Sequence, residues 1–201
     1  MKGKFITFEG SEGCGKSTQS EMLYRYLKSR GMKVIYLREP GGVSLSEKIR
    51  GLLLDPESRI SPEAETLLYM AARAQVVKDV IQPALKAGKI VICDRFLDST
   101  VAYQGFGLGI DIGMIKAIGK FATLGIKPYI TFFLDLPVKK GLKHRSNCKD
   151  RIERRSFKYH EAVRKGYLEL ARLEPKRIRV IKVEDDKFAT QANIRKLTDA
   201  L

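Results

Sequence analysis

Gly10-Ser11-Glu12-Gly13-Cys14-Gly15-Lys16-Ser17 has the spacing G-x-x-x-x-G-K-[ST], and this stretch decides the fold that the sequence predicts. The residues just before it, Phe5–Phe8, form a short apolar run that is typical of a buried strand. The residues after it, 18–30, place their apolar side chains on one helical face and stop at Gly31. A strand, a glycine-rich loop and a helix in this order indicate a phosphate-binding loop, because backbone N–H groups and a helix N-terminus attract an anion. The alternative, a plain turn between a strand and a helix, does not require the four fixed positions.

Side chains within this loop have chemistry that suits bound phosphate. Lys16 is expected to reach the outer phosphates of a nucleotide, and the Ser17 hydroxyl is expected to hold Mg²⁺. For Cys14, the helix N-terminus and Lys16 should lower the thiol pKa, although we interpret this residue as a small buried filler.

The charge of the chain is strongly positive and unevenly distributed. At 201 residues, one domain spanning residues 1–201 is the simplest organisation, and the formal net charge is +15. Residues 139–179 hold fifteen Lys and Arg against five acidic residues, so this segment alone contributes +10. It is either a solvated helical face or a lid that faces phosphates. Nucleic acid would be another partner for such a chain, but no basic strand carries interleaved aromatic residues, so no nucleic-acid partner is expected.

Cysteine usage and hydropathy predict the compartment. The three cysteines, at positions 14, 93 and 148, lack paired metal-ligand spacing, and their odd number argues against a disulfide framework. No apolar run suits a signal peptide or a membrane span, so we expect no membrane partner and a cytoplasmic location.

Short apolar runs alternate with longer helical patterns along the chain. The expected strands are Phe5–Phe8, Val34–Leu37, Ile90–Cys93, Tyr129–Leu134 and Ile178–Val183. The expected helices are 17–30, 44–54, 62–87, 111–123, 153–173 and 187–200. In the helix at 62–87, Ser61 is expected to cap the start, and Gly88 is expected to close the end. Strands spaced by helices predict an α/β fold with parallel βαβ units.

Charged residues follow each of the first three expected strands. The loops begin with Glu9-Gly10, Arg38-Glu39-Pro40-Gly41-Gly42 and Asp94-Arg95. In a parallel sheet of this kind, ligands gather beyond the carboxyl ends of the strands, so these charges should lie close to the phosphate loop.

Asp94 and Asp135 are alternative candidates for the metal ligand at this edge, and two arginines are candidates for binding a phosphate. Asp94 ends a buried strand and is expected to hold Mg²⁺ directly or through water. Asp135 also ends a strand, but we interpret it as a turn or helix cap before Pro137. Arg38 and Arg95 are expected to clamp a second phosphate group, with an ion pair to a nearby carboxylate as the alternative for each.

Several motifs together resemble the thymidylate kinase family. They are Phe8-Glu9-Gly10-Ser11-Glu12-Gly13, Arg38-Glu39-Pro40-Gly41-Gly42, Ala71-Ala72-Arg73, Asp94-Arg95 and Ser99-Thr100-Val101-Ala102-Tyr103-Gln104-Gly105. The resemblance runs from about residue 3 to about 183 in the expected order. It implies a P-loop NTPase-type three-layer αβα fold with a five-stranded parallel sheet and a small lid at about 141–155. It also implies transfer of the γ-phosphoryl of ATP to dTMP, giving dTDP and ADP for dTTP biosynthesis, with Mg²⁺ as cofactor and a homodimeric assembly.

The resemblance assigns a role to each matching position. The ATP site would comprise Gly10, Ser11, Glu12, Gly13, Cys14, Gly15, Lys16, Ser17 and Thr18. The dTMP site would comprise Glu12, Arg38, Tyr69, Arg73, Arg95, Ser99, Thr100, Tyr103 and Gln104. Within it, Tyr69 would stack on thymine, Arg73 would bond its carbonyl, and Tyr103 would crowd the ribose 2′ position. From the residues alone, Tyr69 would be a core residue and Glu12 a solvated loop carboxylate.

The lid is the expected source of catalytic cations. Some members of the family carry a basic residue in the loop where this chain has Gly13, and those without it use lid arginines, as the bacterial type does. The expected catalytic residues are therefore Lys16, Arg95, Arg145 and Arg151, with Lys149 behind them. Arg154, Arg155 and Lys158 are interpreted as a solvated basic helix start, and His144 and His160 as surface residues.

Two other functions fit part of the sequence. A deoxynucleoside kinase, or another nucleoside monophosphate kinase, would share the phosphate loop, and Glu39 could serve the former as a base. A nucleotide-gated nucleic-acid-binding module would use the positive charge, but it leaves Arg73 and Tyr103 without a role.

Overall fold

Five parallel strands form the central sheet of the computed structural model, which describes residues 3–144 and 150–199. The strands are β1 (Phe5–Glu9), β2 (Val34–Arg38), β3 (Ile90–Asp94), β4 (Ile130–Asp135) and β5 (Ile178–Lys182), in the order β2-β3-β1-β4-β5. Every pair of neighbours is parallel, with Phe8 of β1 opposite Asp94 of β3 and Phe132 of β4. The five predicted strands are confirmed, and each end lies within one residue of its prediction.

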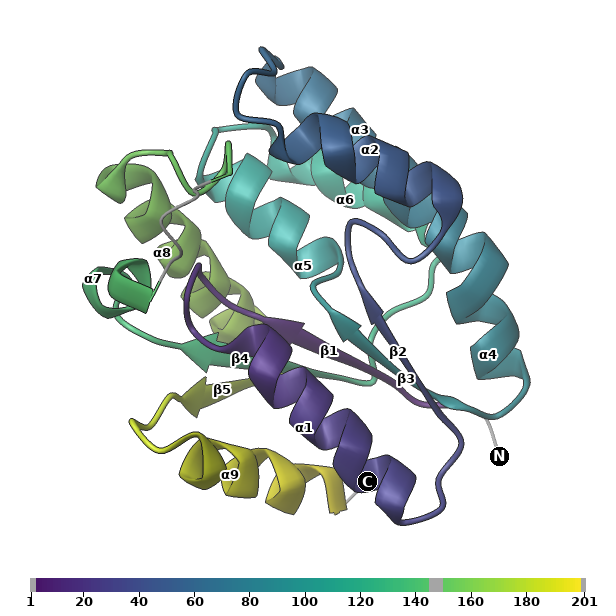
Figure 1. The fold of residues 1–201 in the computed structure, drawn as a ribbon. Coiled ribbons are helices and arrows are strands. Elements are labelled where there is room, and N and C mark those ends of the chain that lie inside the picture. Colours follow the sequence, from purple (N-terminus) through teal and green to yellow (C-terminus); the bar gives the residue numbers. More distant parts are fainter. Residues whose placement is uncertain (1–2, 145–149, 200–201) are drawn as a thin grey trace.

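Helices cover both faces of this sheet, which confirms the predicted three-layer fold (Figure 1). On one face, α1 (Lys16–Ser29) and α9 (Lys187–Asp199) pack together, and Leu23 and Ile194 join Phe8 and Phe132 in one apolar cluster. On the other face, α8 (Phe157–Leu173) packs against β4 and β5. Alternate residues along each strand point to opposite faces, so both layers are built from the same short apolar runs.

The long helix expected at 62–87 is divided by a wider turn. The segments are α3 (Pro62–Val76), a π-helical stretch (Val77–Ile81) and α4 (Gln82–Lys86). Pro83 lacks an N–H and its ring crowds the preceding turn, so a continuous α-helix would be strained here, and a π-turn relieves that conflict. The predicted start is confirmed, because the Ser61 hydroxyl accepts a hydrogen bond from the Ala64 N–H (3.2 Å).

The remaining helices frame the carboxyl edge of the sheet. They are α2 (Ser44–Leu54), α5 (Leu97–Thr100), a π-helical stretch (Val101–Phe106), α6 (Ile112–Ala122), α7 (Val138–Gly141) and a 3-10 turn (Leu142–His144). Among the described residues, no helix has the length and apolar character that crossing a bilayer would need.

Two predictions about the chain around α8 were wrong. The helix expected from residue 153 begins at Phe157, because the Ser156 hydroxyl caps it by accepting from the Tyr159 N–H (3.2 Å). His160 is fully buried rather than exposed, since it lies three residues before Val163 and seven before Tyr167 on the inner face of the helix. The side chain of His144 lies outside the described part of the chain.

Candidate active site

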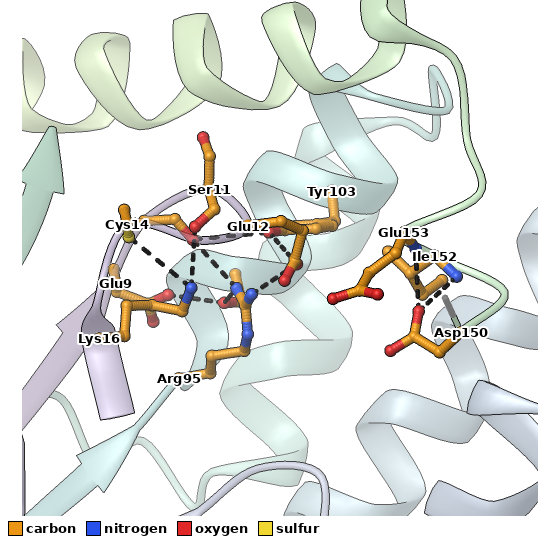
Figure 2. Close-up of polar contacts among 12 residues, drawn as sticks. Glu9, Ser11, Glu12, Cys14, Lys16, Arg95, Tyr103, Asp150, Ile152 and Glu153 are labelled. Carbon is orange, nitrogen blue, oxygen red and sulfur yellow. Dashed lines mark hydrogen bonds and ion pairs between the residues drawn. The ribbon is translucent and has the colours of Figure 1, made fainter. Parts of the chain in front are cut away.

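The phosphate loop joins β1 to α1 and takes a conformation that only glycine adopts freely. Gly10, Gly13 and Gly15 have φ angles of 149°, 71° and 86°. Lys16 folds back over the loop, and its Nζ donates a hydrogen bond to the Ser11 carbonyl (2.9 Å), as Figure 2 shows. The amide groups of the loop and the positive end of α1 therefore face the same space as the lysine ammonium.

The loop also packs against the residue that ends α7. A methyl group on Gly13 would collide with the Gly141 carbonyl, and one on Gly141 would collide with the Glu12 carbonyl. The two backbones lie too close for any side chain between them. Gly13 thus brings the expected lid region into direct contact with the phosphate loop.

Ser17 and Asp94 meet at the end of the loop, as the sequence predicted. The Ser17 hydroxyl, in the first turn of α1, donates to Asp94 Oδ2 at the end of β3 (2.5 Å). The other carboxylate oxygen, Oδ1, is buried and has no hydrogen-bond partner among the described residues. A hydroxyl beside an unpartnered carboxylate oxygen is a donor set that suits Mg²⁺ next to a triphosphate, so these residues fit the expected metal.

Arg95 lies at the centre of a polar cluster that faces the loop (Figure 2). Its Nη2 donates to Glu12 (2.7 Å), its Nη1 donates to the Gly10 carbonyl (3.2 Å), and Tyr103 also donates to Glu12 (2.7 Å). Burial disfavours a charge on Glu12, but Arg95 and Lys16 outweigh it and lower the pKa of this carboxyl to about 2. The backbone of Arg95 has φ 72°, a left-handed conformation that is rare outside glycine. The surrounding structure therefore holds this arginine in place at some conformational cost.

A cavity of about 370 Å³ opens beside this cluster. Fourteen of the residues predicted from the sequence line it: Glu12, Gly13, Gly15, Lys16, Ser17, Thr18, Arg38, Tyr69, Asp94, Arg95, Ser99, Thr100, Tyr103 and Gln104. The fold thus brings together residues that lie as far apart in the chain as Glu12 and Gln104. At one end lies the phosphate loop, and at the other lie an aromatic ring, a hydroxyl and an amide.

Arg73 lies behind the cavity wall, fully buried. It donates to Glu39 through Nε (2.7 Å), to the Thr100 hydroxyl (3.0 Å) and to the Phe96 carbonyl (3.0 Å). Arg73 is thus directly behind Thr100, which does face the cavity. Glu39, which the sequence offered as a base, has one of its oxygens engaged by this arginine.

Two more arginines, Arg38 and Arg50, line the cavity in addition to Arg95. Arg38 is half-exposed and forms a long ion pair with Glu47 (3.6 Å). Arg50, from α2, donates to the Pro40 carbonyl (3.0 Å) and also lines the cavity. Burial, and then the repulsion of Arg38, lower the pKa of Arg50. Cations that repel one another at an opening favour a bound anion.

Comparison with known proteins identifies the family of this chain. A family model described as thymidylate kinase matches residues 8–194. The chain belongs to the thymidylate kinase family. The predicted resemblance is therefore confirmed.

Members of the thymidylate kinase family match the chain over nearly all of its length. A thymidylate kinase of Kosmotoga olearia is 49% identical over 179 residues, covering 88% of this chain and 86% of the relative. A thymidylate kinase of Gloeobacter violaceus is 46% identical over 199 residues, covering 97% and 94%. The crystal structure of a thymidylate kinase from Ehrlichia chaffeensis superimposes with a TM-score of 0.80 at 33% identity, covering 98% of this chain and 99% of that one.

The structure describes only part of the segment expected to be the lid, about residues 141–155. Arg145 and Lys149 lie outside the described residues. Arg151 forms an ion pair with Glu65 (2.6 Å) and donates to the Leu53 carbonyl (2.9 Å), away from the phosphate loop. The interpretation of Arg155 as solvated was wrong, because this side chain also reaches Glu65 (2.6 Å).

Two other sequence interpretations changed on folding. The expected low pKa of Cys14 was wrong: burial of the thiol raises its pKa, although Lys16 and Arg95 oppose this, and the residue is the buried filler that we also expected. The Asp135 carboxylate binds Arg164 of α8 through two hydrogen bonds (2.7 and 3.0 Å) instead of capping a turn.

Sequence reasoning assigned no role to four residues that organise the site: Glu9, Arg50, Glu65 and Tyr167. Glu9 is fully buried and accepts hydrogen bonds from the Phe96 N–H (2.8 Å), the Ser99 hydroxyl (2.6 Å) and the Tyr167 hydroxyl (2.9 Å). Its position at the end of a buried strand was the one available signal. Arg50 and Glu65 lie on amphipathic helices. A charged residue on such a helix is normally predicted to face solvent, because the sequence does not show which helix packs beside it.

Proposed function

We propose that the chain transfers the γ-phosphoryl group of ATP to dTMP, giving dTDP and ADP as a step of dTTP synthesis. One observation carries this proposal: a single cavity joins a phosphate loop to a pocket with arginines, an aromatic ring and an amide. A nucleoside monophosphate is the acceptor that suits this pocket, because its phosphate can meet the arginines while its base meets the aromatic ring and the amide.

The donor end would hold ATP through residues 10–18. The loop amides and Lys16 would cradle the outer phosphates. Ser17 and Asp94 would hold Mg²⁺, and a bound magnesium ion neutralises charge on the transferred group. The support for this metal is the buried Oδ1 of Asp94, which has no hydrogen-bond partner in the described part of the chain and lies beside the Ser17 hydroxyl.

The acceptor end would hold dTMP in line with the donor phosphate. Arg38 and Arg95 would grip its phosphate, with Arg50 as a third cation near the opening. Tyr69 would stack on the base, and Tyr103 would lie against the sugar. Because the acceptor is already an oxyanion near neutral pH, the site needs no strong base, and positioning with cationic stabilisation supplies the catalysis.

We also propose a working form for the whole chain. Residues 1–201 would form one nucleoside monophosphate kinase domain whose lid, at about 141–155, supplies Arg145 and Arg151 to the transferring phosphoryl. Arg73 would act on the base through Thr100 or after a small rearrangement. The enzyme would work in the cytoplasm without a nucleic-acid or membrane partner; the thiols of Cys14 and Cys93, buried and unbridged, support a reducing compartment.

A homodimer is the assembly that we propose. The helices α2, α3 and α6 lie next to one another (Figure 1). Each exposes large apolar side chains, namely Leu52 on α2, Leu67 on α3, and Met114 and Phe121 on α6. Phe121 is 82% exposed, which is unusual for phenylalanine on a monomer. Burial of this surface against a second copy would remove it from water.

An acceptor panel tests the reaction. The chain with MgATP should phosphorylate dTMP far better than dCMP, dGMP, AMP or thymidine in a coupled ADP-release assay. A clear preference for AMP or thymidine would refute the proposal.

An arginine variant tests the assignment of the two ends. Arg95→Ala should lose most activity, because the acceptor phosphate and Glu12 both lose their cation, while ATP binding measured by calorimetry stays near the wild-type value. Arg172→Ala, at an exposed position on α8, is the matched control. Loss of ATP affinity in Arg95→Ala would move Arg95 to the donor end.

A further inference from the structure

Glu65 is a fully buried carboxylate in the first turn of α3, close to the acceptor end of the cavity. It lies four residues before Tyr69, so the two side chains share one face of the helix. Its partners come from two other parts of the chain. Oε1 accepts from Gln104 Nε2 (2.8 Å), and Oε2 pairs with Arg151 and with Arg155, each at 2.6 Å.

These contacts determine which way the Gln104 amide faces. A carboxylate held by two guanidinium groups accepts hydrogen bonds and has none to donate. The amide nitrogen of Gln104 must therefore turn toward Glu65. The amide oxygen is then the end left for a ligand in the cavity that Gln104 lines.

The two arginines lie in the last part of the expected lid, and both pair with the same carboxylate. Arg151 also reaches the Leu53 carbonyl of α2, and the Arg155 guanidinium lies over the Tyr159 ring at 4.6 Å. Both side chains are largely buried, so removal of the Glu65 charge would leave two cations without their counter-ion.

We propose that Glu65 is a positioning residue for base selection: it fixes Gln104 with its amide oxygen toward the acceptor base. An oxygen at this point requires an N–H on the base edge that faces it. Thymine and uracil carry a hydrogen on N3, whereas N3 of cytosine is itself an acceptor. Glu65 would thus favour dTMP over dCMP without touching either. The inference rests on the proposed function, since it concerns the acceptor of that reaction.

Glu65→Gln is the decisive variant. The two arginines would take the new amide oxygen, so the new amide nitrogen would face Gln104 and turn the Gln104 nitrogen toward the base. We expect the ratio of kcat/KM for dTMP to that for dCMP to fall about tenfold or more. Glu63→Gln makes the same chemical change at an exposed position two residues earlier in α3 and should leave the ratio unchanged.

The outcomes separate positioning from a merely structural role. Equal loss of activity toward dTMP and dCMP in Glu65→Gln, with the ratio unchanged, would overturn the inference. In a Gln104→Ala background, Glu65→Gln should have no further effect on the ratio; a full additional effect there would also overturn it.

A measurement on the wild-type chain covers the case in which Glu65→Gln does not fold. Thymidine monophosphate methylated at N3 has lost the N–H that the amide oxygen requires, and its kcat/KM should be about tenfold or more below that of dTMP. Comparable use of the two compounds would overturn the inference. A wild-type chain that does not phosphorylate dTMP at all would instead refute the proposed function.

Discussion

Glu9 provides a stringent test of the electrostatics of the site. The carboxyl is fully buried at the end of β1, and burial, followed by the charge of Asp98, raises its pKa from the usual 4.5 to about 7. Hydrogen bonds from Ser99 and the Phe96 N–H, together with the charge of Arg95, only partly offset this rise. Substitution by glutamine keeps the shape but removes the titration.

The contribution of Glu9 to the free energy of unfolding follows from the size of its pKa rise. One pKa unit corresponds to about 1.4 kcal/mol, so the rise from 4.5 to about 7 amounts to about 3 kcal/mol in full. A carboxyl with a raised native pKa favours folding while it is protonated, and this contribution is lost as pH increases through the native value. Between pH 5 and pH 8, the free energy of unfolding of the wild type should therefore fall by about 2.5 kcal/mol relative to that of Glu9→Gln.

Urea unfolding followed by circular dichroism at pH 5, 6, 7 and 8 gives this difference directly. The other titrating groups are present in both proteins and cancel in the difference. Glu63→Gln serves as a control, since it reports the loss of a carboxylate at an exposed position. If the difference between wild type and Glu9→Gln changes by less than about 1 kcal/mol over this range, the assignment of a raised pKa to Glu9 is wrong.

Three further variants test the lid, the loop contact and the assembly. Arg151→Ala should lower kcat more than it weakens dTMP binding, measured by steady-state kinetics and calorimetry; an unchanged kcat would move the catalytic role to other lid cations. In Gly141→Ala, the new methyl group should collide with the Glu12 carbonyl and lower kcat/KM about tenfold or more. In Gly51→Ala, the methyl group enters open space and should raise the free energy of unfolding by about 0.5–1 kcal/mol. Similar behaviour of the two variants would refute the close contact. Phe121→Asp should halve the mass measured by analytical ultracentrifugation, because a dimer interface would bury the new charge unpaired; a wild-type monomer would contradict the proposed homodimer.

Some site residues were predictable because their signal lies within a short segment of the sequence, and others were not. Gly13, Lys16 and Ser17 are fixed by spacing within one loop, and Asp94 by the end of one strand, so the sequence could place them at a common edge. Arg155 gave no such signal: it reads as one of many cations at a helix start, and only the buried carboxylate of Glu65 makes it a partner. His160 was misread for the same reason, since its burial depends on what packs against α8.

The sequence by itself determined the strand, loop and helix at the phosphate site, the parallel sheet and the family resemblance. These follow from local spacing and from the period of apolar residues, which a linear chain displays directly. Only the tertiary structure decided how charges are paired: Arg73 with Glu39, Arg95 with Glu12, and Arg151 with Glu65. Those pairs join segments that are distant in the chain, and the free energy of a charge depends on the burial and the counter-ion that folding gives it.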